Sequence, residues 1–346
     1  MTNEGKTNSL KPVIIWLITG CVLIAAMVVI GGITRLTHSG LSMTEWNPVT
    51  GIFPPATEEA WQEEFNKYKQ IPEYELKHSW MELEDFKFIY FWEFLHRQWG
   101  RMLGVVFIVP FLFFVWRGYI RGALLRRNLL VMLWGGGVGA LGWFMVKSGL
   151  TDLPDVSHYR LAVHLTAAFG LFLFIWWTAL NLMYSAKKSV SPHNKSVYRF
   201  IIALLVVAFI QVIYGAFTAG LRAGYVHTTF PLMTGNFIPH DFLAVTGTAV
   251  DLLEHKSSVQ FMHRIFAFLL VILTGVLVWK LRKKTIPSTV RSGIKAVTVT
   301  LIVQFLLGVF TILYSVPPAL GVLHQIGALA FLAALVYLMH RVKAMK

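Results

Sequence analysis

The stretch "WEFLHRQWGRMLG", residues 92–104, carries four ionisable side chains inside an otherwise apolar run. The segment "FKFIYF" precedes it and "VVFIVPFLFFVW" follows it, so Glu93, His96, Arg97 and Arg101 lie in a run long enough to span a bilayer. A charged side chain at the centre of a membrane helix costs roughly 2.5–3.5 kcal/mol even on a lenient insertion scale. We therefore expect these side chains to have specific partners or a function.

The whole chain has the composition of a membrane protein that crosses the bilayer several times. Of its 346 residues, 56% are hydrophobic and 14% are charged, against about 25% charged in a typical soluble domain. The net charge of +14 is concentrated in short loops, which indicates membrane orientation and argues against nucleic-acid binding. The single cysteine, Cys21, excludes an intrachain disulfide and a cluster of thiolate ligands.

Eight apolar runs of about 20 residues predict an all-α fold with eight transmembrane helices. They cover residues 12–34, 87–116, 129–147, 159–184, 198–220, 258–279, 294–315 and 319–340. Lys and Arg without any acid occupy the loops after the second, fourth and sixth runs, whereas the long loop 35–86 holds ten acidic and four basic residues. The positive-inside rule then places both termini on the cytoplasmic side and loop 35–86 outside.

Four of the twelve histidines lie within these runs, each near the outer end of its run. They are His96, His164, His263 and His324, in the second, fourth, sixth and eighth runs. A rise of about 1.5 Å per residue puts all four at a similar depth in the outer leaflet. A Gly or Ala follows each histidine three or four residues later, on the same helix face. This clearance suits a flat haem whose iron is bound by the imidazole.

The chain also shows signs of an internal duplication. The segment "EFLHRQWGR" is echoed by "QFMHRIFAF", and "LAVHLTAAFGLFLF" by "LGVLHQIGALAFLA". The offsets 263 − 96 = 167 and 324 − 164 = 160 differ by seven residues. We interpret the chain as two pseudo-symmetric four-helix bundles, residues 1–190 and 191–346. Each bundle would hold one haem between two histidines, His96 with His164 and His263 with His324.

The two halves differ at one ionisable position. Glu93 lies three residues before His96, whereas Gln260 occupies the matching place before His263. A desolvated carboxyl group beside one haem would be suited to moving protons, and an ion pair with Arg97 or Arg101 is an equal alternative. Arg97 and its counterpart Arg264 are candidates for binding haem propionates, with contact to lipid phosphates as the alternative.

Other classes of protein remain open on these patterns alone. A lone histidine in a membrane helix is more often a packed polar residue or part of a proton path, but four at matched depth favour haem. A zinc site would need three or four clustered ligands. A dihaem b-type cytochrome that only transfers electrons is the main alternative, and Glu93 in one half argues against it. A transporter would show discontinuous helices, for which the run Gly135–Gly137 is the candidate.

Several long motifs resemble the heme A synthase family, in its mitochondrial and proteobacterial-like branch. They include "GGITRLTHSGLSMTEW", "FKFIYFWEFLHRQWGRMLG", "HLTAAFG", "TAGLRAGYVHTTFPLMTGNFIP", "QFMHRIFAF" and "LHQIGA", and together they span about residues 30–330. The resemblance implies an oxidoreductase that converts the C8 methyl group of haem O to the formyl group of haem A, by successive hydroxylations, for cytochrome oxidase biogenesis.

The resemblance also implies roles for the residues singled out above. His263 and His324 would ligate a haem b cofactor, His96 and His164 would hold the substrate haem, and Glu93 would be the acid that the oxidation needs. A location in the bacterial inner membrane follows, with haem O and lipid as partners. The electron donor, a partnership with haem O synthase (the farnesyltransferase) and homo-oligomerisation stay open. Some members carry a cysteine pair in the outer loops, for which this chain has no residues.

Overall fold

Long helices laid side by side form the body of the protein. The computed structural model describes residues 3–46, 51–149, 156–184, 194–282 and 285–345. The α-helices are α1 (Asn3–Leu36), α2 (Glu58–Tyr68), α3 (Leu83–Trp116), α4 (Gly122–Gly149), α5 (His158–Met183), α6 (Lys195–Gly220), α7 (Asp251–Glu254), α8 (Lys256–Leu281), α9 (Ser288–Leu313) and α10 (Pro318–Ala344). Eight of them, all except α2 and α7, are long and apolar enough to cross a membrane. The predicted all-α fold with eight such helices is therefore confirmed.

Several helices begin before the apolar run that predicts them. Helix α4 begins at Gly122, seven residues before the expected start, and α9 begins at Ser288, six residues before it. The added turns contain Arg126, Arg127 and Arg291. Long basic side chains favour helix and can lay their alkyl stems along apolar surface while the charged head reaches water, so a hydropathy pattern underestimates these ends.

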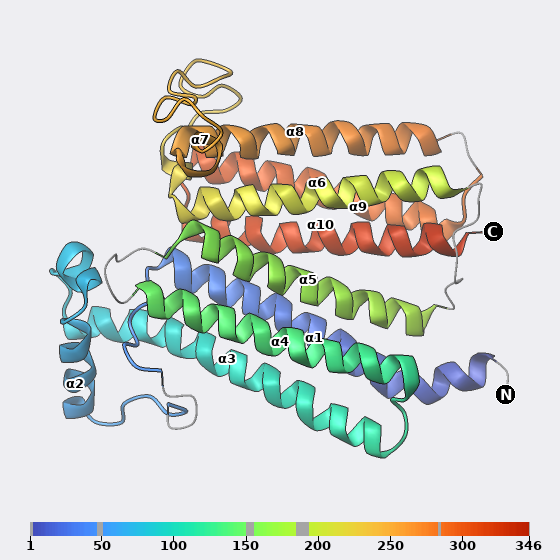
Figure 1. The fold of residues 1–346 in the computed structure, drawn as a ribbon, viewed down its shortest axis with the longest axis horizontal. Coiled ribbons are helices and arrows are strands. Elements are labelled where there is room, and N and C mark those ends of the chain that lie inside the picture. The colour runs from blue at the N-terminus through green and yellow to red at the C-terminus, as the bar shows by residue number, and fades with distance from the viewer. Residues whose placement is uncertain (1–2, 47–50, 150–155, 185–193, 283–284, 346) are drawn as a thin grey trace.

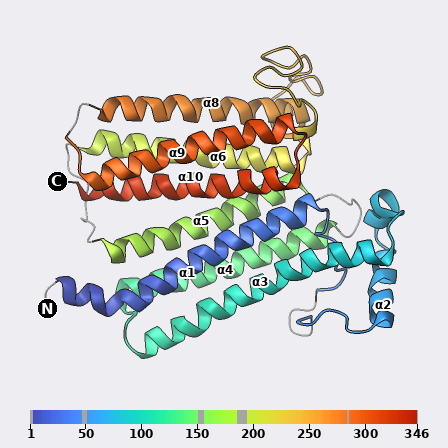
Figure 2. The same ribbon diagram turned by 180° about the vertical axis from the view of Figure 1, so that it is seen from behind.

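The helix contacts repeat in the two halves of the chain. In the first half, α1 packs against α3 and α5, and α4 packs against α3 and α5; in the second, α6 packs against α8 and α10, and α9 packs against α8 and α10. Helices α1 and α5 meet α10 and α6 between the halves, as Figures 1 and 2 show. This pattern is consistent with a duplicated four-helix bundle. The predicted boundary, between residues 190 and 191, lies outside the described residues.

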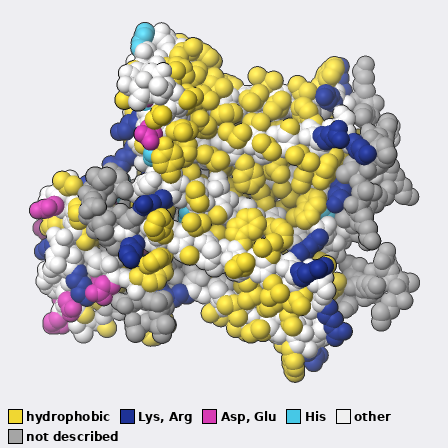
Figure 3. All heavy atoms as spheres, in the orientation of Figure 1, with side chains coloured by type: hydrophobic (Ala, Val, Ile, Leu, Met, Phe, Trp, Pro, Cys, Tyr) yellow, Lys and Arg dark blue, Asp and Glu magenta, His cyan; other side chains and the backbone are white. Residues whose placement is uncertain are grey.

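The flanks of the bundle are apolar where they face outward. Trp116 is 78% exposed and Leu133 is 76% exposed, and a band of hydrophobic side chains covers the face drawn in Figure 3. On that face, Lys and Arg lie at both ends of the band, whereas acidic side chains occur only at the end opposite the termini. An apolar band between polar ends is the surface expected of a protein in a bilayer.

The segment between α1 and α3 folds into an outer cap, which we define as residues 37–46 and 51–82. It contains α2, capped at its start by the Thr57 side chain, and a π-helical turn, Tyr74–His78. Phe65, Tyr68 and Met81 join Phe86 and Tyr90 in a small apolar core of the cap and the outer end of α3. The sequence was interpreted here only as a long acidic loop, so this folded cap is new.

The transporter alternative loses the feature that suggested it. Helix α4 runs without interruption from Gly122 to Gly149, through the run Gly135–Gly137. Gly136 and Gly137 have no neighbouring side chain where a Cβ atom would lie, so these glycines neither break the helix nor admit a close neighbour.

Candidate active site

His263 of α8 and His324 of α10 face each other inside the second bundle. Their ring centroids are 6.3 Å apart and the ring planes are inclined by 78°. Two imidazoles that bind one metal ion from opposite sides, with metal–nitrogen bonds of about 2 Å, have ring centres roughly 6 Å apart. The separation of the two rings thus suits a single iron between them.

Each of the four histidines packs against a glycine of another helix. That helix is the membrane-spanning helix that comes directly before the histidine's own in the sequence. A Cβ atom placed on the glycine would lie within 2.9–3.4 Å of the histidine Cε1. The pairs are Gly31 with His96, Gly142 with His164, Gly215 with His263 and Gly308 with His324. The absence of a side chain on these glycines permits this close approach, which is tightest at Gly308 and loosest at Gly31. The sequence analysis missed these glycines.

The first bundle holds His96 on α3 and His164 on α5. The two rings are near enough to interact electrostatically, and their glycines lie on α1 and α4. The ligand roles expected of the four histidines stay predictions. Among the described residues, no group of three or more His, Cys, Asp and Glu side chains is arranged to hold a metal ion.

Glu93 is buried and bound on both carboxylate oxygens. Its Oε1 accepts a hydrogen bond of 2.6 Å from Nη2 of Arg97, and its Oε2 accepts bonds of 2.8 Å from Oγ of Ser42 and from the backbone N–H of Met43. The ion-pair alternative is thus present in the structure, with Arg97 as the partner. Three donors, one of them charged, thus bind the two carboxylate oxygens. Glu93 therefore also joins α3 to the outer cap.

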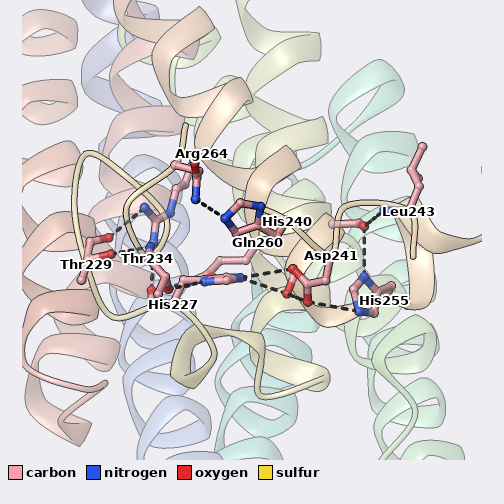
Figure 4. Close-up of polar contacts among 12 residues, drawn as sticks. His227, Thr229, Thr234, His240, Asp241, Leu243, His255, Gln260 and Arg264 are labelled. Carbon is pink, nitrogen blue, oxygen red and sulfur yellow. Dashed lines mark hydrogen bonds and ion pairs between the residues drawn. The ribbon is translucent and has the colours of Figure 1, made fainter. Parts of the chain in front are cut away.

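The second bundle repeats this arrangement with a neutral side chain. Gln260 donates through Nε2 to the carbonyl of His227, 2.9 Å away, and Arg264 donates to the carbonyls of Thr229 and His227, each at 2.9 Å (Figure 4). Arg97 likewise donates to the carbonyls of Glu45, at 2.7 Å, and Met43, at 2.9 Å. Each arginine is thus hydrogen-bonded to the backbone of the segment that follows the first membrane-spanning helix in its half of the chain.

The His227 side chain lies in a buried polar network of the loop between α6 and α7. Its ring nitrogens contact Oγ1 of Thr234 at 2.8 Å and Oγ of Ser257 at 3.0 Å, and Ser257 donates to Asp241 at 2.6 Å (Figure 4). Burial lowers the pKa of His227, so the ring is neutral near pH 7. The network fixes the loop that Arg264 and Gln260 hold.

A pocket opens beside the first histidine pair. Its volume is about 420 Å³, and it is lined by Met43, Thr44, Glu45, Trp46, Arg97, Trp143, Val146 and Lys147. Val146 lies one helical turn beyond Gly142, the glycine under His164, and Arg97 directly follows His96. The guanidinium of Arg97 lies over Trp46, 4.9 Å from the ring centre, and the ammonium of Lys147 lies over Trp143, at 5.1 Å. An amphipathic molecule with acidic groups suits such a pocket.

Two glutamines beside the second pair were also missed. Nε2 of Gln211 lies 3.4 Å from Nε2 of His263, and Nε2 of Gln304 lies 3.4 Å from Nε2 of His324. Each glutamine precedes the glycine under its histidine by four residues, in "QVIYG" (211–215) and "QFLLG" (304–308). This repeated Gln-x-x-x-Gly spacing, in the helix before a histidine-bearing helix, was the signal that could have revealed them.

An eight-helix body with histidines inside both bundles defines an integral membrane protein of the helical-bundle class. The match to known proteins is more specific. Residues 14–336 match the model of the COX15-CtaA family, described as cytochrome oxidase assembly protein, and the chain belongs to this family. The predicted resemblance is thereby confirmed.

Three relatives show how far the similarity extends. The chain is 47% identical to the heme A synthase of Flavobacterium johnsoniae, over 96% of this chain and 98% of that protein. It is 44% identical to the heme A synthase of Parvibaculum lavamentivorans, over 94% of this chain and 93% of that protein. It is 40% identical to the heme A synthase COX15 of Arabidopsis thaliana, over 98% of this chain and 76% of that protein.

Proposed function

We propose that this chain is a heme A synthase, an integral membrane oxidoreductase that converts the C8 methyl group of haem O to the formyl group of haem A. The observation that carries this proposal is the pairing of four histidines at two sites of unequal polarity, His96 with His164 beside Glu93 and His263 with His324 beside Gln260. Family membership and the nearly full-length relatives with that name support it.

The second pair is proposed to hold a resident haem b, and the first pair the substrate. The 6.3 Å separation of the His263 and His324 rings supports a bis-histidine haem. Haem b bound there would supply one-electron redox chemistry. The pocket beside His96 and His164 offers Arg97 and Lys147 as partners for the propionates of haem O. These propionates would compete with the backbone carbonyls that now occupy Arg97.

Glu93 is proposed to act on the substrate side alone. Its carboxylate is the acid–base group nearest to His96 along α3, three residues away, and Arg97 donates a hydrogen bond to it. A propionate that drew Arg97 away would leave this carboxylate with fewer hydrogen-bond donors. Acid–base function would thus be linked to substrate binding.

Extraction of the haems tests the proposal. The protein is purified from cells that make haem O, and the extracted haems are separated and identified by mass. Haem b together with haem A or its hydroxylated precursor is the expected result. Two haem b per chain, with no modified haem, would instead indicate an electron-transfer cytochrome and would overturn the proposal.

A further inference from the structure

Each bundle has one loosely packed flank. Of the contacts between adjacent helices round a bundle, the weakest joins its second and third helices, α3 with α4 in the first half and α8 with α9 in the second. The two halves meet through α1, α5, α6 and α10, so both loose flanks face away from the other half, toward the surrounding lipid (Figure 1). A haem that passes sideways between a bundle and the bilayer would cross such a flank.

Three aromatic rings close the flank of the second bundle. The ring centre of Phe230, from the loop between α6 and α7, lies 6.1 Å from that of Phe268 on α8 and 6.0 Å from that of Phe305 on α9. The rings of Phe268 and Phe305 are 5.7 Å apart, so each ring contacts the other two. We call these three residues the phenylalanine cluster. Phe268 follows His263 by five residues, about 7.5 Å along the helix, so the cluster lies at nearly the depth of the second histidine pair.

The internal duplication identifies the matching positions in the first bundle. The two carbonyls bound by Arg264 follow the two bound by Arg97 by 227 − 43 = 184 and 229 − 45 = 184 residues. The arginines themselves are 264 − 97 = 167 residues apart, and the glycines under the last histidine of each half are 308 − 142 = 166 residues apart. These offsets match Phe230 with Trp46, Phe268 with Arg101 and Phe305 with Gly139.

The first bundle has no such cluster at the matching positions. Trp46 is 46% exposed and lies under the guanidinium of Arg97, at the pocket beside the first histidine pair. Gly139 has no side chain, and no described residue lies within 4 Å of where its Cβ atom would be. Arg101 carries a charge and is hydrogen-bonded within α3. In the described part of the chain, therefore, no aromatic pair joins α3 to α4.

Helix packing alone does not account for the phenylalanine cluster. Lipid tails are as apolar as a phenylalanine ring, so burying the rings between membrane helices gains little hydrophobic free energy. The first bundle keeps α3 beside α4 without them. The difference therefore concerns what can pass through the flank of each bundle.

We propose that the phenylalanine cluster retains the resident haem of the second bundle, whereas the matching flank of the first bundle, between Trp46 and Gly139, is the port through which the substrate haem enters from the lipid and the product leaves. The inference rests on the proposed function, which needs one haem that stays and one that is exchanged. Trp46 also lines the pocket that contains Arg97 and Lys147. A haem that crosses this flank thus reaches the groups proposed to bind its propionates.

The first test opens the flank of the second bundle. Phe230→Ala and Phe305→Ala, singly and together, are compared with Phe237→Ala in the same loop and Phe310→Ala on α9, which are 54% and 44% exposed and lie outside the cluster. The measured quantities are haem b per purified chain and the rate at which excess apomyoglobin extracts it. We expect Phe230→Ala to release haem b roughly tenfold faster, the effect of losing two aromatic contacts. The two control variants should match the unaltered protein, and an unchanged rate in the folded double variant would overturn the inference.

The reciprocal test closes the port of the first bundle and stays available if the alanine variants fold poorly. Gly139→Phe supplies the ring that Phe305 supplies in the second bundle. We expect slower uptake of haem O added to the purified protein in lipid nanodiscs, with the haem b content unchanged. Gly137→Phe is the matched control, because it points to the opposite side of α4 and a Cβ there also meets no described residue within 4 Å. Equal uptake by the two variants would overturn the assignment of the port.

His263→Ala separates this inference from the proposed function. If this variant retains haem b, the ligand assignment of the proposed function fails. If it loses haem b, while the variants of the phenylalanine cluster release haem b at the unaltered rate, only the inference fails.

Discussion

At the scale of single residues, Glu93 has a structural contact and a proposed chemical role that a substitution must separate. Its carboxylate joins α3 to the outer cap through Ser42 and Met43, and it is the acid proposed for the oxidation of the substrate. The pseudo-equivalent Gln260 makes only the structural kind of contact, with the carbonyl of His227. A neutral amide at this position is therefore compatible with the architecture of a bundle.

We predict that Glu93→Gln keeps both haems bound but stalls the oxidation. The amide cannot accept or deliver the proton that the proposed chemistry requires. Ser42→Ala serves as the control, because it removes one hydrogen bond to the carboxylate, worth about 1 kcal/mol, and leaves the acid in place. Haem analysis of both purified variants checks this. Full conversion to haem A by Glu93→Gln would remove Glu93 from the mechanism, and equal loss in both variants would assign it a structural role.

The sequence singled out the candidate residues of the site and the Glu93–Arg97 ion pair as one alternative, but not the partners that are distant along the chain. Spacing and duplication singled out the four histidines, Glu93 and the two arginines, because helical periodicity and an internal repeat can both be read directly from the sequence. Ser42 is 51 residues from Glu93, and no periodicity links them. Gln211 and Gln304 were missed for the same reason, since each lies beside a histidine of another helix.

At the scale of helices, the four glycines under the histidines set how closely neighbouring helices approach. We predict that Gly308→Ala lowers the haem b content, because its Cβ would lie 2.9 Å from Cε1 of His324 and would push the ring aside. Gly275→Ala is the matched control on α8, where a Cβ would meet nothing within 4 Å. The absorbance of bound haem b per chain measures both. Equal haem content in the two variants would show that the close approach is not needed for ligation.

The outer cap should loosen in acid. Burial, with Arg222, His78, Lys77 and Arg35 nearby, lowers the pKa of His38 to about 4, and burial, with Lys77 and Arg222, lowers that of His78. The unfolded cap, with histidine pKa values of about 6.5, then binds more protons than the folded cap between about pH 6.5 and pH 4. The stability of the cap therefore falls as the pH drops through this range.

Hydrogen exchange of the cap at pH 7.5 and pH 5 checks this prediction. We expect faster opening at pH 5 after correction for the intrinsic exchange rate. His38→Asn should reduce the difference, because Asn does not titrate and tolerates the φ of 54° at this position. A cap that opens equally at both pH values, or a variant with the full difference, would contradict the assignment.

Hydropathy predicted the elements of the membrane body well but missed the cap. An apolar run of 19 to 30 residues, the range of the eight predicted runs, has few alternatives to a membrane helix, so all eight were found. Helix α2 has only 11 residues and a polar sequence, "EEAWQEEFNKY", and its apolar side is formed by Trp61, Phe65 and Tyr68. Its stability comes from packing on Phe86 and Tyr90 of α3, a tertiary contact that local sequence does not encode.

At the scale of the whole molecule, the two halves meet through residues that the duplication relates. The side chain of Arg35 donates to the carbonyl of Ala219, and that of Arg222 contacts His38. Each contact joins positions 184 apart, and 215 − 31 = 184 is the offset between the glycines under His263 and His96. Contacts between equivalent positions are expected near a pseudo-two-fold axis, so these residues support the interpretation as a duplicated bundle.

The last prediction concerns how the molecule lies in the membrane. Both termini lie at one end of the bundle, with the acid-free basic loops, and the cap and the loop 221–250 lie at the other (Figure 1). The positive-inside rule places the basic end in the cytoplasm. Alkaline phosphatase fused after Lys346 should then be inactive, and a fluorescent protein fused there should fluoresce, whereas phosphatase inserted after the exposed Gly235 should be active. The opposite pattern of activities would show that the orientation in the membrane is the reverse of the one predicted. Both histidine pairs would then lie in the inner leaflet, and haem O would have to enter from the cytoplasmic side.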